Sequence, residues 1–159
     1  MYWPQTVHSL GMTEAQRGWT VSFILIPTMA GSLLAGRNKF ITRDRSGLIK
    51  ILLIIGVGLL ISSCASNLIV FLIGLVVIEL PYGGLRIVLY GHLYEEIHPN
   101  HRSTVNSMVS AVQTAGGAVS LLIMGRVADL YSPQIAMGLG GSIIIMVLTT
   151  ILLIRLVRQ

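Results

Sequence analysis

Charge is scarce in this sequence. Only 11% of its 159 residues are Asp, Glu, Lys or Arg, whereas 53% are apolar, and this balance is unusual for a water-soluble domain. The single cysteine, Cys64, excludes a disulfide framework within the chain. The net charge of +5 does not indicate a nucleic-acid partner, because the basic residues are not gathered with aromatic residues on one soluble face. The composition therefore predicts that the partner of this chain is a lipid bilayer.

The motifs of common enzymes are also missing. The sequence has no glycine-rich phosphate loop, no Ser/His/Asp set and no His-Glu-x-x-His zinc motif. Glu95 and His98 form a Glu-x-x-His pattern that resembles half of a di-metal site, but the second half is absent and Pro99 follows at once. We therefore predict no metal site, no cofactor and no enzymatic activity, and we interpret this stretch as a solvated loop.

Long uncharged apolar runs fill most of the chain. A helix needs about 20 such residues to cross the hydrocarbon core of a bilayer. Five runs meet this requirement, at approximately 18–36, 48–65, 68–93, 103–125 and 133–155. The sequence thus predicts an all-α membrane protein whose residues 17–159 form a bundle of five transmembrane helices, preceded by an external segment, residues 1–16.

The basic residues are distributed unevenly between the two sides of this predicted bundle. Eight lie on one side, in the loop 37–50, at Arg102 and near the C-terminus, and two, Arg17 and Arg126, lie on the other. Because Lys and Arg resist translocation, the side with eight is predicted to be cytoplasmic. We expect a multi-pass protein of the cell membrane, plasma or inner, with its N-terminus outside and its C-terminus in the cytoplasm.

The start of the chain suggests that a preceding helix is missing. An odd number of spans with an external N-terminus is unusual for a complete protein. Met1-Tyr2-Trp3-Pro4 is typical of the outer end of a transmembrane helix, because Tyr and Trp prefer the membrane interface. We therefore expect this chain to be a fragment of a longer protein.

Glu79 is the strongest candidate for a functional residue. It lies near the midpoint of the third span, where an ionisable group is costly unless it faces protein, water or a partner. On a helix it shares one face with Tyr82 and Arg86. Pro81 and the two glycines after Tyr82 are expected to weaken the helix there, as at transporter binding sites. Glu79 either exchanges a proton or meets a cationic substrate during transport, or it forms a structural ion pair with another helix.

The fourth span carries a second polar stripe. One narrow arc of this helix holds Asn106, Ser110 and Gln113, followed by Gly117 and Ser120. These side chains either line a substrate path or pack against a neighbouring helix, because small and polar residues mediate contacts between membrane helices. The first span has a similar face, which we interpret as packing: Thr28, Gly31, Ser32 and Ala35.

Three segments resemble one family of transporters. The loop from Tyr94 to Thr104, which runs into Val105-Asn106-Ser107, looks like the connection between the tenth and eleventh helices of major facilitator superfamily transporters. Gly116-Gly117 followed by Gly125-Arg126-Val127-Ala128-Asp129 resembles the eleventh helix and its end, and Tyr2-Trp3-Pro4 looks like the outer end of the seventh. The loop 36–45 departs from the family's pattern, because its Asp-Arg pair is displaced and a Gly-Arg pair is missing.

The resemblance implies both a fold and a function. The five spans would be helices eight to twelve, part of the C-terminal six-helix bundle of the family, and a six-helix N-terminal half would be missing. The protein would be a secondary active transporter of a small solute, similar to drug or sugar exporters, and would work as an antiporter coupled to protons. The resemblance would place Glu79, Arg86 and Gln113 at the central cavity. With the polar residues described above, the predicted lining is Glu79, Tyr82, Arg86, Asn106, Ser110 and Gln113, and Glu79 is the candidate for proton coupling. The alternative is a non-transporting membrane protein, either an inert truncation or an accessory helix bundle.

Overall fold

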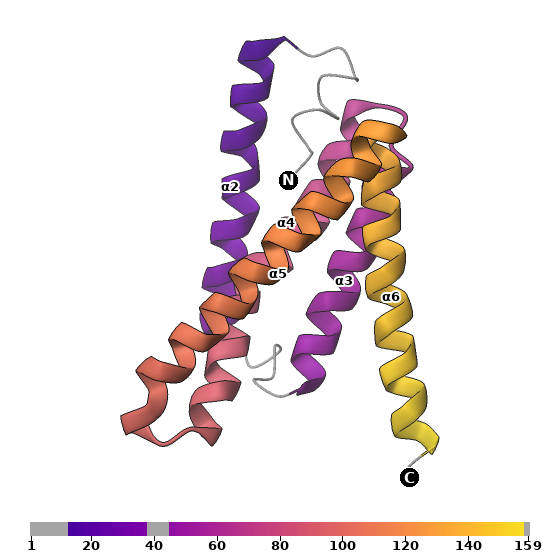
Figure 1. Ribbon diagram of the computed structural model, residues 1–159. Helices are drawn as coiled ribbons and strands as arrows, with labels where there is room; N and C mark the ends of the chain where they lie inside the picture. The colour runs from indigo at the N-terminus through magenta and orange to yellow at the C-terminus, as the bar shows by residue number, and fades with distance from the viewer. Residues whose placement is uncertain (1–12, 38–44, 158–159) are drawn as a thin grey trace.

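The computed structural model describes residues 13–37 and 45–157. These ranges form five long helices and one short 3-10 helix, without any β-strand (Figure 1). The helices are α2 (Glu14–Arg37), α3 (Arg45–Ser63), α4 (Leu68–Glu96), η1 (Pro99–His101), α5 (Arg102–Leu130) and α6 (Pro133–Val157). Each of the five long helices is long and apolar enough to cross a membrane. The predicted class, an all-α fold with five membrane-spanning helices, is confirmed.

Polar residues at the helix ends set where the helices begin. The Asn67 side chain accepts a hydrogen bond of 2.9 Å from the backbone N–H of Val70, and so caps the start of α4. Ser132 accepts a 3.2 Å hydrogen bond from the N–H of Ile135 at the start of α6, where Pro133 occupies the first turn. These two short caps separate long apolar segments that would otherwise continue as helix.

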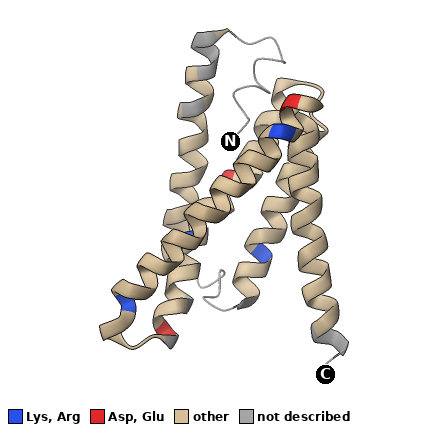
Figure 2. Ribbon diagram, in the orientation of Figure 1, with Lys and Arg blue, Asp and Glu red and all other residues tan. Residues whose placement is uncertain are grey.

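Helix α4 is the centre of the packing. It packs on α2 along one side and on α3 along another, and α3 also packs on α6. Phe71 and Val88, both on α4, are among the most completely buried side chains described. Figure 2 shows that few positions along the described helices are charged, and many of the exposed side chains are large and apolar. The bundle therefore presents mainly apolar side chains to its surroundings.

Helix α5 is the least embedded of the long helices. It packs on α6 near one end and on η1 at the other, and it crosses the bundle diagonally (Figure 1). Its buried residues are Gly125 and Ala128, and every residue from 110 to 123 is exposed. With 29 residues it is longer than the second helix of the bundle, α3, which has 19. A tilt accommodates such extra length within a bilayer of fixed thickness.

The helices differ from the expected spans in a few places. Helix α2 begins at Glu14, inside the segment expected to be external, and α3 ends at Ser63 rather than near residue 65. Helix α4 runs unbroken through Pro81 and the glycines beside it, so the expected weakening produces no break. Residues 1–12 of the predicted external segment, residues 38–44 of the basic loop, and residues 158–159 lie outside the described residues.

Candidate functional site

Glu79 is buried at the contact between α2 and α4. The residue is 7% exposed, which makes it a buried charged residue among core positions that are mostly apolar. The Thr28 hydroxyl of α2 donates a 2.9 Å hydrogen bond to Glu79 Oε2. Glu79 makes no ion pair with any side chain that the structure describes. The partner that holds the acid is therefore a neutral hydroxyl rather than a basic residue.

Close backbone packing brings Thr28 and Glu79 together. A Cβ added to Gly31 of α2 would overlap the carbonyl oxygen of Leu80, and a Cβ added to Gly83 of α4 would overlap the carbonyl oxygen of Thr28. The two helices thus touch through their backbones directly beside the hydrogen bond. Glycine is required at both positions because any side chain would force α2 and α4 apart.

Prolines lie next to both partners. Pro27 precedes Thr28, and Pro81 follows Glu79 by two residues, and both rings are buried inside continuous helices. A proline has no N–H, so the carbonyl four residues earlier loses its helical partner. The backbone on either side of the Thr28–Glu79 contact therefore has fewer internal hydrogen bonds than an ordinary helix.

The other residues predicted on the third span do not join Glu79. Tyr82 is 47% exposed, and Arg86 is exposed further along α4. The predicted stripe is therefore divided: Glu79 and Gly83 face α2, whereas the phenol and the guanidinium lie at the surface of the described bundle. Neither of the latter two side chains forms a hydrogen bond or an ion pair with the buried acid.

The polar residues of α5 are also separate from Glu79. Asn106, Ser110 and Gln113 are exposed, and α5 packs on α6 and η1 rather than along α4. The Ser107 hydroxyl beside them donates to the carbonyl of Ser103, within its own helix. The described residues therefore leave the polar stripe of α5 without a protein surface opposite it.

Sequence reasoning did not identify Thr28 as the partner of Glu79. It grouped Thr28 with the packing face of the first span. Depth in the membrane was the available signal. Thr28 lies ten residues after Gly18, where its span begins, and Glu79 lies eleven residues after Leu68, where its own span begins. Because the first and third spans run in the same direction, these residues share one level of the membrane. A hydroxyl at the same depth as a buried acid is a candidate partner.

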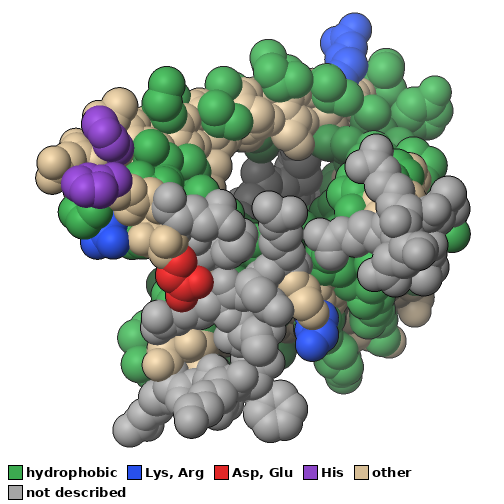
Figure 3. Space-filling view, turned by 90° about the horizontal axis from the view of Figure 1, so that it is seen from below, with side chains coloured by type: hydrophobic (Ala, Val, Ile, Leu, Met, Phe, Trp, Pro, Cys, Tyr) green, Lys and Arg blue, Asp and Glu red, His purple; other side chains and the backbone are tan. Residues whose placement is uncertain are grey.

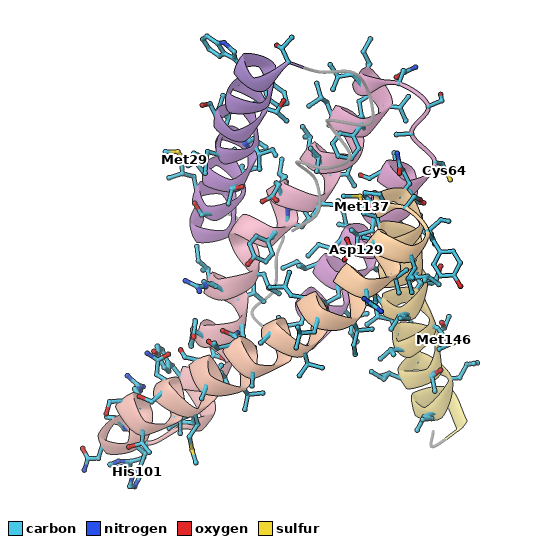
Figure 4. All side chains as sticks on the ribbon, turned by 45° about the horizontal axis from the view of Figure 1, so that its top comes forward. Met29, Cys64, His101, Asp129, Met137 and Met146 are labelled. Atoms are coloured by element: carbon cyan, nitrogen blue, oxygen red, sulfur yellow. The ribbon has the colours of Figure 1, made fainter. Side chains whose placement is uncertain are left out.

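The connection between α4 and α5 is held by an arginine. Arg102 Nη2 donates a 3.1 Å hydrogen bond to the carbonyl of Tyr94, and its guanidinium carbon lies 5.4 Å from the centre of the Tyr94 ring. The ring centres of His98 and His101 lie 6.3 Å apart. Figure 3, a view of the molecule from below, shows described histidine side chains gathered at one edge. Figure 4 places His101 far from Cys64, which lies at the opposite end. Arg102 thus fixes the turn and satisfies a carbonyl at the end of α4.

The candidate metal pattern does not form a cluster. Among the described residues, no group of three or more His, Cys, Asp or Glu side chains is placed to hold a metal ion. His98 Nδ1 instead faces the backbone N–H of Asn100 at 3.5 Å. Glu95 lies exposed in the last turn of α4, and His98 lies exposed in the turn between α4 and η1.

These features define a multi-pass helical membrane protein with one acid buried between two spanning helices. The sequence model of the Major Facilitator Superfamily matches residues 1–159, the whole chain, and the chain belongs to this family of membrane transporters. Comparisons with curated proteins and with solved structures find no match.

Proposed function

We propose that this chain is the C-terminal part of a secondary active transporter that moves a small solute across the cell membrane in exchange for protons. The chain supplies helices eight to twelve, and a six-helix N-terminal half supplies the other side of the solute path. Membership of the family supports transport. The observation that carries the coupling is Glu79, a buried acid with a hydroxyl partner and without an ion pair to any described residue.

The absence of a basic partner among the described side chains favours a proton-exchanging Glu79 over a structural ion pair. A structural ion pair would hold Glu79 in its charged form, because protonating the carboxylate would leave the partner cation buried and unpaired. A hydroxyl can donate to a carboxylate and accept from a carboxylic acid, so it serves both forms. Glu79 is therefore suited to gaining and losing a proton during a transport cycle.

The exposed polar groups supply the proposed solute path. Tyr82 and Arg86 on α4, and Asn106, Ser110 and Gln113 on α5, would line a cavity between this bundle and the missing half. An exposed guanidinium and amide are costly against lipid tails, whereas they are solvated in an aqueous cavity. The solute would be a drug-like or sugar-like molecule that bears hydrogen-bonding groups. The N-terminus would face outside and the C-terminus the cytoplasm, as the eight basic residues on one side favour.

A vesicle assay with the full-length protein tests this proposal. Labelled sugars and cationic drugs are offered to membrane vesicles, with a pH gradient imposed and then collapsed by a protonophore. We expect gradient-dependent movement of a solute by the wild-type protein, and its loss in Glu79→Gln, because the amide keeps the shape of the acid but cannot exchange a proton.

Glu95→Gln is the matched control, because Glu95 is exposed outside the buried contact. It should retain the gradient dependence. Coupling through Glu79 is refuted when Glu79→Gln and Glu95→Gln transport alike. A full-length protein that moves none of the solutes would favour the non-transporting alternative.

A further inference from the structure

The Thr28 hydroxyl lies within hydrogen-bond distance of two acceptors. Its Oγ1 atom is 2.9 Å from Glu79 Oε2 on α4, and it is also 2.9 Å from the carbonyl oxygen of Ile24, one turn earlier on α2. A hydroxyl carries one proton and can donate to one acceptor at full strength. Both contacts can be hydrogen bonds at the same time only when Glu79 is protonated, because its carboxyl group then supplies the second proton.

The two protonation forms of Glu79 therefore use the same geometry differently. When Glu79 is a carboxylate, Thr28 donates its proton to Oε2, and the Ile24 carbonyl keeps only its helical partner. When a proton from water binds Glu79, the new O–H donates to Thr28 Oγ1, and the Thr28 hydroxyl turns to donate to the Ile24 carbonyl. One O–H bond forms on the carboxyl group, and Thr28 neither gains nor loses a proton.

From this geometry we infer that Thr28 is the positioning residue of the proton site at Glu79, and that its hydroxyl exchanges acceptors whenever the proton binds or leaves. The inference deepens the proposed function and rests on it. Because the exchange needs only a rotation about one side-chain bond, Glu79 stays hydrogen-bonded to α2 in both forms. The backbone contacts at Gly31 and Gly83 hold the oxygen atoms in place during the exchange.

Neighbouring charges do not supply an alternative partner among the described side chains. The helices packed on α4 are α2 and α3. The charged residues of α2 are Glu14, Arg17 and Arg37, all near its ends, and those of α3 are Arg45 and Lys50. The side chains of Lys50 and Arg86 are described, both are exposed, and neither pairs with Glu79. Tyr82, the nearest phenol along α4, is also exposed.

Infrared difference spectroscopy of the full-length protein in lipid bilayers tests the inference without any knowledge of the solute. The spectra are recorded between high and low pH, and the C=O stretch of the protonated Glu79 carboxyl is the band that Glu79→Gln removes. In Thr28→Val, which keeps the shape but loses the hydroxyl, we expect this band at higher wavenumber, because the carboxyl O–H has lost its acceptor. Thr28→Ser should restore the wild-type position.

Ser32→Ala is the matched control on the same helix. The Ser32 hydroxyl donates to the Met29 carbonyl at 2.8 Å within α2, so its removal should leave the band unchanged.

Thr28→Ala provides the same test as Thr28→Val with a smaller side chain, should the valine variant fail to fold. A band that is lost in Glu79→Gln but keeps its wild-type position in Thr28→Val and Thr28→Ala would overturn the inference and leave the proton site standing. A protein in which Glu79→Gln removes no carboxyl band would overturn the proposed coupling and the inference together.

Discussion

At the scale of single residues, Ser62 has an unusual environment. It is 0% exposed, and its hydroxyl oxygen has no hydrogen-bond partner among the described atoms. An unsatisfied buried hydroxyl costs about 1–3 kcal/mol, so Ser62→Ala should raise the free energy of unfolding by about 1 kcal/mol. Chemical denaturation in detergent micelles measures the change.

Ser63→Ala is the control for this prediction. The Ser63 hydroxyl donates to the Leu60 carbonyl at 2.8 Å, so its removal loses a bond and should not stabilise the protein. A Ser62→Ala protein that unfolds more easily than the wild type would mean that the hydroxyl has a partner in the membrane.

The two residues of the buried hydrogen bond, Glu79 and Thr28, were not equally predictable from the sequence. The position of Glu79 in an apolar run requires it to avoid lipid, and the burial found agrees with that requirement. Depth in the membrane makes Thr28 a candidate but does not select it, because a threonine in a helix can bond its own helix's carbonyl as readily as a neighbour. The small-residue face of α2 predicts which side of that helix packs, but it does not predict which helix lies opposite.

At the scale of helices, the contact between α2 and α4 depends on glycine. In the 159-residue chain, Gly83→Ala places a methyl group against the Thr28 carbonyl, and the resulting separation should lower stability by about 1–3 kcal/mol. Gly116→Ala on α5 meets nothing within 4 Å and should gain up to about 1 kcal/mol from helix propensity. Thermal unfolding in detergent compares the two variants. Equal stabilisation by both alanines would show that α2 and α4 are not in backbone contact.

The number of helices was predictable and the continuity of α4 was not. Helix number follows from the length of each uncharged run against the thickness of a bilayer. Pro81 was expected to weaken α4, but the helix is continuous there, and α2 and α3 pack on it from two sides and support it. Local sequence does not contain that tertiary support.

At the scale of the whole molecule, the polar stripe of α5 marks where the proposed missing half would lie. Gln113 and Leu122 are both exposed, and their nine-residue separation places them on opposite sides of the helix. Sequence alone left packing and solute path open for this stripe. Residues outside this bundle decide between the two roles, because no described element covers α5 between its two ends.

Cysteine labelling of the full-length protein in intact membranes distinguishes the two faces of α5. The background lacks every native cysteine, including the exposed Cys64, which is replaced by serine and is the single cysteine of the 159-residue chain. With an aqueous path along the polar stripe, Gln113→Cys reacts rapidly with a water-soluble maleimide, whereas Leu122→Cys faces lipid and reacts slowly, because a thiol must ionise in water to attack. In the 159-residue chain alone, both cysteines face lipid and the difference should disappear. Equal rates in the full-length protein would instead assign the stripe to helix packing and move the solute path away from α5.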